Sequence, residues 1–120
     1  MILADTSVWI EHLRGGNTPL GPLLNEGMIV MHPFIAGELA CGNLKFRTTF
    51  LSYLLVLPQA KMASDPEAMV LVESRRLWGK GLGWIDIHLI ASAILSGCHL
   101  WSLDKRLRAA AASFGLAVQL

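Results

Sequence analysis

Four of the nine acidic residues stand inside apolar stretches of the sequence, where a carboxylate is costly unless something compensates its charge. They are Asp5, Glu38, Asp86 and Asp104. Few lysines or arginines lie in these stretches, and converging carboxylates repel one another unless a cation joins them. Carboxylate oxygens suit Mg²⁺ or Mn²⁺, whereas no His or Cys pair has the spacing of zinc ligands. The four acids therefore predict a magnesium or manganese site.

A cation held by carboxylates beside open coordination positions can bind a phosphate oxygen and activate a water molecule for in-line attack. The chemistry predicted is phosphodiester hydrolysis. Three hydroxyl residues beside the acids, Thr6, Ser7 and Ser102, can support it by hydrogen-bonding the acids or the bound water. Ordinary capping of the helices that follow is the alternative role for these hydroxyls.

The elements that must position the acids alternate along the chain. Apolar runs predict strands at 2–4, 28–31, 54–57, 99–102 and 116–118. Caps and glycine stops predict helices at 8–14, 18–25, 33–41, 46–53, 64–78, 84–96 and 105–114. This alternation indicates one α/β domain over residues 1–120, with a mainly parallel sheet covered on both faces. The acids then fall at strand ends or in the early turns of the next helices, which is one edge of the sheet.

Composition narrows the class of protein. With 53% apolar and 16% charged residues, the chain is expected to fold and to leave apolar surface for self-association or a partner. No basic segment precedes an apolar one at the N-terminus, and polar residues interrupt the apolar stretch 87–103. We therefore expect a cytoplasmic protein without a membrane span.

The net charge of +1 gives no global attraction for nucleic acid. Cys41 and Cys98 are expected to be buried free thiols.

Four motifs carry a family resemblance. They are Asp5-Thr6-Ser7 after an apolar strand, Gly37-Glu38-Leu39, the segment from Gly83 through Asp86 to Ser92, and Ser102-Leu103-Asp104 before a basic helix. With them, essentially the whole chain resembles the PIN-domain family, and in particular the VapC-type toxin ribonucleases of bacterial toxin–antitoxin pairs. Two positions depart from the family pattern. Ser102 stands where threonine is frequent, which keeps the hydroxyl, and His32-Pro33 replaces a hydroxyl residue after the second strand.

The resemblance implies a three-layer fold with a sheet of four or five strands, and a Mg²⁺- or Mn²⁺-dependent endoribonuclease that acts on RNA. Asp5, Glu38 and Asp86 match the family's metal-binding acids, and Asp104 matches its fourth acid. The resemblance also implies a homodimer that is blocked by a small antitoxin, whose C-terminal segment covers the active site. Because the antitoxin commonly carries the DNA-binding part, no direct DNA binding is expected of this chain.

Substrate contacts are assigned to residues near these motifs. Lys105, Arg106 and Arg108 follow the last acid and can contact RNA phosphates, or they can form a solvated basic helix face. His88 lies two positions after Asp86, so it is expected to pack nearby or to contact RNA instead of binding the same metal. The tryptophans at positions 9, 84 and 101 can stack on bases, but a place in the core or an interface is the expectation for them.

Other classes of protein fit the sequence less well. The glycine-rich segment 79–83 follows a helix instead of a strand and lacks the Ser or Thr that follows the lysine of a phosphate-binding loop. A dinucleotide-binding fold carries glycines after its first strand, and residues 6–10 contain none. The remaining alternative is a catalytically inactive PIN-like module that binds protein or RNA. All four acids are intact, which argues against this alternative because an inactive module does not need them.

Overall fold

The first strand is the centre of the fold. In the computed structural model, which describes residues 1–120, β1 (Ile2–Ala4) lies between β2 (Ile29–Val30) and β3 (His99–Trp101). Both pairings are parallel, and all three residues of β1 are buried. The α/β class and the parallel sheet predicted from the sequence are confirmed.

The sheet has three strands instead of the four or five expected. Isolated parallel bridges extend it by one position at each edge, from Met31 to Gln59 and from Leu100 to Ala117. The C-terminal segment expected as a strand at 116–118 is thus reduced to a single bridge. The bridge at Ala117 lies within a predicted strand, whereas Gln59 lies after the strand predicted at 54–57, and neither bridge grows into a ladder.

The strand expected at 54–57 is wrong, because these residues complete α4 (Arg47–Val56) and its cap. Leu54 is fully buried, and Phe50 and Leu51 pack against the same core. Positions 50, 51 and 54 share one face of a helix, whereas a strand would send alternate residues to opposite faces. A short apolar run does not reveal this by itself, since it suits a strand and a buried helical turn equally.

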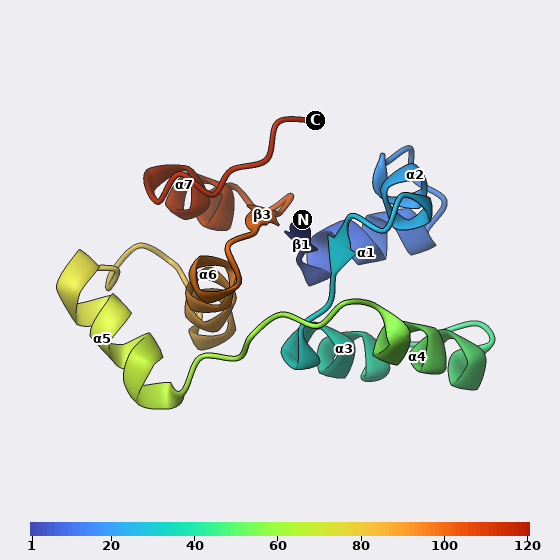
Figure 1. Cartoon of the computed structure of the whole chain (residues 1–120), viewed down its shortest axis with the longest axis horizontal. Helices are drawn as coiled ribbons and strands as arrows, with labels where there is room; N and C mark the ends of the chain where they lie inside the picture. Colours follow the sequence, from blue (N-terminus) through green and yellow to red (C-terminus); the bar gives the residue numbers. More distant parts are fainter.

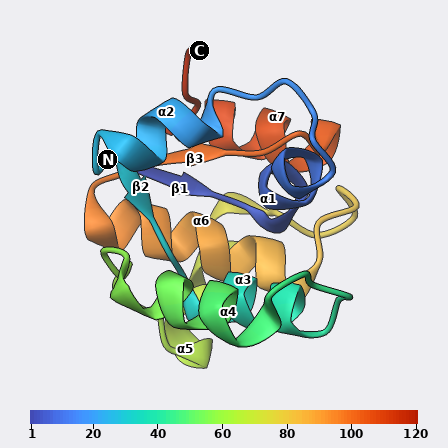
Figure 2. The ribbon, with the colours of Figure 1, turned by 90° about the vertical axis from the view of Figure 1, so that its right-hand side faces the viewer.

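Helices cover both faces of the sheet (Figures 1 and 2). Besides α4, they are α1 (Thr6–Leu13), α2 (Leu20–Asn25), α3 (Pro33–Ala40), α5 (Asp65–Arg75), α6 (Trp84–Ser96) and α7 (Lys105–Ser113). Figure 2 shows α2 and α7 on one side of the strands and α3, α4 and α6 on the other. The outer helix α5 packs against α6. None of these helices has the length and apolar character needed to cross a membrane.

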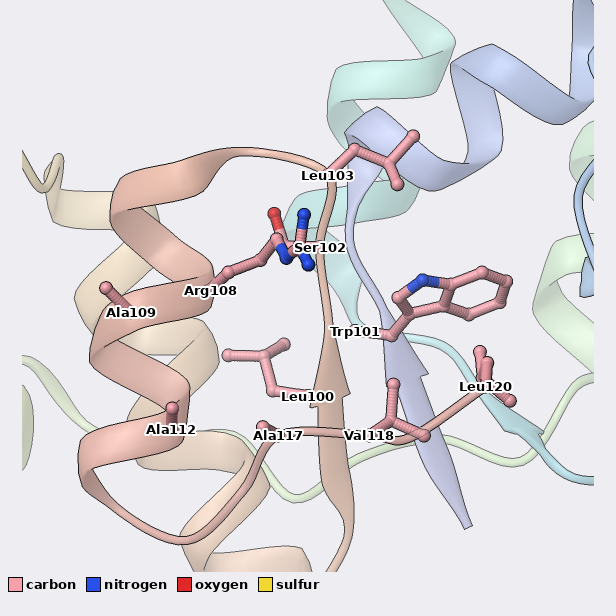
Figure 3. Close-up of a pocket in the computed structure, with 10 residues that line it drawn as sticks. All are labelled: Leu100, Trp101, Ser102, Leu103, Arg108, Ala109, Ala112, Ala117, Val118 and Leu120. Atoms are coloured by element: carbon pink, nitrogen blue, oxygen red, sulfur yellow. The ribbon is translucent and has the colours of Figure 1, made fainter.

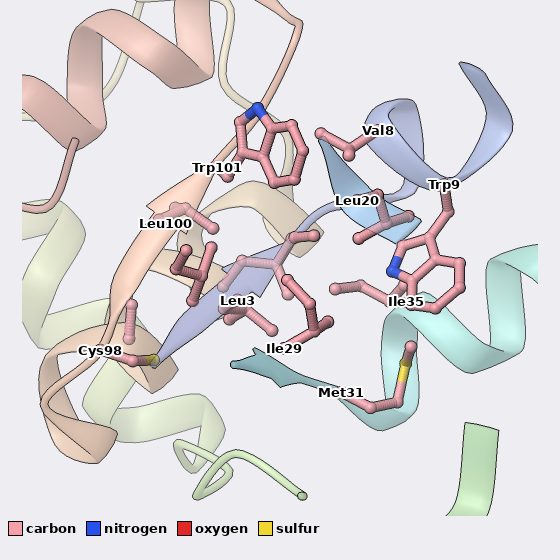
Figure 4. Close-up of a cluster of buried hydrophobic side chains, with 14 of the residues drawn as sticks. Leu3, Val8, Trp9, Leu20, Ile29, Met31, Ile35, Cys98, Leu100 and Trp101 are labelled. Atoms are coloured by element: carbon pink, nitrogen blue, oxygen red, sulfur yellow. The ribbon is translucent and has the colours of Figure 1, made fainter. Parts of the chain in front are cut away.

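The core surrounds β1 and the inward faces of the helices (Figure 4). Leu3 and Trp9 are fully buried, and the Trp9 ring meets Phe50 edge-on at 6.0 Å between centroids. Burial of each large apolar side chain of this kind contributes about 1.5–3 kcal/mol. Cys98 belongs to this core, as expected, but the expectation for Cys41 is wrong. Cys41 caps the C-terminal end of α3 and is exposed, because the apolar residues beside it in sequence face the other side of the helix.

His32 begins α3 in place of the usual hydroxyl cap. Its Nδ1 accepts a hydrogen bond from the Phe34 amide at 2.9 Å, and its Nε2 lies 3.1 Å from Ser92 Oγ. Since Nδ1 accepts, Nε2 carries the proton and donates to the serine. Burial, with a smaller effect of the His88 charge, lowers the pKa of His32 to about 4. This neutral imidazole joins α3 to α6.

Candidate active site at the carboxyl edge of the sheet

The ends of β1 and β3 bring two of the predicted acids to one edge of the sheet. Ala4 pairs with Trp101, and the Asp5 amide donates to the Trp101 carbonyl at 2.9 Å. The strand arrows in Figure 2 point to the side of the molecule at which α1, α6 and α7 begin. Residues that follow the strands, and residues in the first turns of these helices, therefore meet there.

Asp5 is the best anchored of the four acids. Its Oδ1 accepts hydrogen bonds from the Ser7 hydroxyl and from the amides of Ser7 (3.1 Å) and Val8 (3.4 Å), so it caps α1. Its Oδ2 accepts from the Ser102 hydroxyl at 2.7 Å. The residue is only 7% exposed. Burial raises the pKa of the Asp5 carboxyl above its usual value of 3.8, while the bonds from Ser7, Ser102 and the amides lower it.

Two serines link Asp5 to the loop that carries Asp104. The Ser102 hydroxyl donates to Asp5 and accepts from the Asp104 amide at 3.0 Å, and the Ser7 hydroxyl accepts from the Leu103 amide at 3.0 Å. Both hydroxyls, which were expected to support the acids or to cap helices, thus hold the end of β3 against the start of α1. The Asp104 side chain is exposed, and its Oδ1 caps α7 through the amides of the second and third helical residues, at 2.9 and 3.1 Å.

Glu38 reaches the edge by a different route. The Thr6 hydroxyl donates to Glu38 Oε1 at 2.7 Å, and Thr6 directly follows Asp5. The expectation that every acid lies at a strand end or in an early helical turn is wrong for Glu38, which lies in the last turn of α3. The reason is the direction of α3, which packs against α1 and carries its C-terminal turn toward the start of that helix.

Asp86 lies in the first turn of α6, where its Oδ2 accepts from the Gly83 amide at 2.9 Å. No hydrogen bond joins it to the other three acids, and no group of three or more His, Cys, Asp or Glu side chains is close enough to hold a metal ion. The donor chemistry nevertheless fits a hard divalent cation. All four side chains offer carboxylate oxygens, and no lysine or arginine lies within 4.0 Å of any of them.

The basic residues predicted to contact substrate are exposed on α7. These are Lys105, Arg106 and Arg108, and none has a carboxylate within 4.0 Å. Arg108 borders a cavity of about 400 Å³ between α7, β3 and the C-terminal segment, with Ser102 in its wall (Figure 3). The basic face of α7 is therefore free to meet a negatively charged ligand beside Asp104.

His88 takes the packing role that was one of its two expected roles. The residue is 1% exposed, and its ring lies edge-on to Phe34 and Trp84, at 5.1 and 4.8 Å between centroids. Its Nε2 is 3.0 Å from Asp65 Oδ1, which joins α6 to α5. This burial leaves the ring no surface for RNA. Sequence reasoning assigned Asp65 only to a helix start, and no spacing signal could have paired residues 23 positions apart.

Known proteins share the sequence and the fold of this chain. Residues 2–113 match the PIN domain family, so the chain belongs to this family. It is 46% identical over 119 residues to Ribonuclease VapC32 of Mycobacterium tuberculosis, in both strain H37Rv and strain CDC 1551, covering 98% of this chain and 96% of each relative. The crystal structure of PAE2754 from Pyrobaculum aerophilum has a similar fold, with a TM-score of 0.63 and 15% identity over 90% of this chain and 82% of that one.

Proposed function

We propose that this chain is a divalent-metal-dependent endoribonuclease and the toxin of a toxin–antitoxin pair. The observation that carries the proposal is the hydrogen-bonded network at Asp5, which ties the residue after β1 to Ser102 and, through the Ser102 hydroxyl, to the Asp104 amide. The 46% identity to a protein named as a ribonuclease, over nearly the whole length of both chains, supports the same activity.

Asp5, Glu38, Asp86 and Asp104 would hold Mg²⁺ or Mn²⁺. When bound, the ion supplies a Lewis acid for a phosphate oxygen and lowers the pKa of a coordinated water molecule. The protein's own part is to orient the oxygens. Ser7 and Ser102 fix both oxygens of the buried Asp5, and Thr6 fixes Glu38.

The exposed cations of α7 would bind the substrate. These cations are Lys105, Arg106 and Arg108, which come directly after Asp104 in the sequence. Contacts from such side chains to phosphates position a nucleic acid without reading its sequence. Their charges would offset the repulsion between an RNA backbone and the carboxylates. His88 is not included, because its ring is buried.

The partners that we propose are a second copy of the chain and a small antitoxin. An apolar cavity of about 530 Å³ opens beside Glu38 and is bordered by Ile10, Leu13 and the 86%-exposed Phe46. We place the C-terminal segment of the antitoxin there, where it would cover the acidic edge. No direct DNA contact is assigned to this chain, and the cytoplasm is the proposed site of action.

The proposed function is tested with purified, antitoxin-free protein and a panel of mixed single-stranded and stem-loop RNAs. Cleavage is measured with Mg²⁺, with Mn²⁺ and with chelator, beside Asp5→Asn prepared in the same way. We expect cuts that need the metal and are absent from the variant. RNA binding without cleavage under every metal condition would instead indicate the inactive binding module.

A further inference from the structure

A third cavity lies between α7 and the connection from α5 to α6. Its volume is about 360 Å³, and its walls come from residues 77–82 and from α7. In Figures 1 and 2 this connection passes close to the end of α7 at which the helix begins. The cavity therefore lies between the glycine-rich segment and the basic helix α7. The sequence of that segment does not match a phosphate-binding loop.

Three cations border this cavity: Lys80 from the connection and Lys105 and Arg106 from α7. They are three of the ten lysines and arginines in a chain whose net charge is only +1. The only contact within 4.0 Å between a carboxylate and a basic side chain joins Asp65 to His88, so no carboxylate neutralises the three cations. Like charges around one concave surface repel each other, and an anion bound between them relieves that repulsion.

The backbone of the connection is shaped to fit Arg106. Gly81 has φ +75°, and a Cβ atom there would lie 2.6 Å from Arg106 Cδ and 2.8 Å from its Nε. A side chain at this position would thus displace the arginine, and a left-handed φ is also costly for any residue but glycine. The glycine lets the connection lie directly against the guanidinium arm, which brings Lys80 to the same cavity as Arg106.

Both walls of the cavity continue into acids of the proposed active site. The connection ends at Gly83, whose amide donates to Asp86, and α7 begins directly after Asp104. We propose that this cavity is a subsite for a backbone phosphate of RNA next to the phosphate that is cleaved, with Lys80 as its previously unassigned contact. The subsite rests on the proposed ribonuclease function. A guanidinium fork beside two ammonium groups suits phosphate oxygens, and continuity with the acidic edge favours RNA over an acidic protein segment.

The test compares Lys80→Ala with Lys61→Ala. Lys61 is exposed, and its amide bonds Ser96 at the far end of α6, about 18 Å along that helix from its start. Binding of wild type and variants to a fluorescent single-stranded RNA is measured in chelator over a range of KCl concentrations. Lys80→Ala should weaken binding roughly 3- to 10-fold near 0.1 M salt and reduce the slope of log Kd against log salt by about 0.7. Lys80→Arg should restore both quantities, and Lys61→Ala should match wild type.

Cleavage kinetics separate the subsite from the proposed activity. Where wild type cleaves, Lys80→Ala should raise KM by the factor lost in binding and leave kcat within about twofold. Cleavage with no difference between Lys80→Ala and Lys61→Ala overturns the subsite and leaves the ribonuclease standing. RNA binding that depends on Lys80 without any cleavage supports the subsite and overturns the activity, and no RNA binding by wild type overturns both. Loss of affinity for the antitoxin alone would make the cavity a protein site and overturn the proposal.

Discussion

The two corners at which β1 leads into α1 and β3 leads into α7 have the same local design and different surroundings. At each corner an aspartate caps the helix by accepting from two backbone amides. Asp5 follows the central strand, is 7% exposed and accepts two serine hydroxyls as well, whereas Asp104 follows the outer strand and is exposed. Position in the sheet, and not the local motif, decides which carboxylate is desolvated.

At the third corner, β2 leads into α3, and the residue that caps the helix is a base in place of an acid. His32 caps that helix from a fully buried position, and burial lowers its pKa to about 4, while burial raises the pKa of Asp5. Both shifts favour the neutral form. Substitutions at Asp5, His32 and Asp104 test whether burial of the capping side chain determines its effect on activity and stability.

The largest effect is expected on cleavage. Asp5→Asn should lower kcat/KM on the order of 1,000-fold, because it removes the proposed ligand that the network holds most firmly. Asp104→Asn should lower it about 10-fold, since that side chain is less fixed. Initial rates with Mn²⁺ on one RNA substrate measure both. Equal losses in the two variants would show that burial of the carboxylate does not set its importance.

The next effect is on stability at low pH. The neutral form of His32 is favoured in the folded state, so the unfolded chain binds more protons between about pH 4 and 6.5. The free energy of unfolding should therefore fall by roughly 3 kcal/mol as the pH drops through that window. His32→Asn keeps a capping acceptor and should remove this dependence, as measured by urea unfolding at several pH values. His99→Asn, which removes an exposed imidazole, should retain it.

Removal of the Ser102 hydroxyl is expected to have a smaller effect on activity. Ser102→Ala deletes the donor to Asp5 and the acceptor for the Asp104 amide, and it should lower kcat/KM about 10-fold. Ser102→Thr keeps the hydroxyl and should retain most of the activity. If alanine and threonine behave alike in rate assays, the hydroxyl does not position Asp5.

The smallest effects are expected on the free energy of unfolding at neutral pH, and they have opposite signs for substitutions at Asp5 and at Asp104. Because the pKa of Asp5 is raised on folding, its ionised form opposes folding increasingly as the pH rises above its usual value of 3.8. Asp5→Asn should therefore stabilise the metal-free protein, on the order of 1 kcal/mol. Asp104→Asn should cost less than about 0.5 kcal/mol, since both residues cap helices well. Thermal unfolding of the two variants in chelator measures the contrast, and destabilisation by Asp5→Asn would contradict it.

Local signals predicted the helices well. The α6 helix has the bounds expected from its glycine stop, and the predicted capping box of Ser64 and Glu67 is present at the start of α5. These features depend on residues within four positions of each other. The same local signals could not decide between strand and helix at 54–57, where the packing of Leu54 into the core selects the helix.

The site was predictable in its residue types but not in its connections. The acids stand out because an apolar context makes a carboxylate costly, and this signal is local. The bonds from Thr6 to Glu38 and from Ser102 to Asp5 join residues 32 and 97 positions apart. Only the path of α3 and the order of the strands create them. The burial of His88 against Asp65 likewise depends on how α5 packs on α6.

The 97-residue separation between Asp5 and Ser102 has a consequence for synthesis. A ribosome releases the N-terminus first, so β1 and Asp5 emerge 97 residues before Ser102, which follows β3. Until then the central strand lacks one neighbour and Asp5 lacks the hydroxyl on its second oxygen. We therefore expect the network around Asp5 to remain incomplete on the ribosome until β3 and Ser102 have emerged.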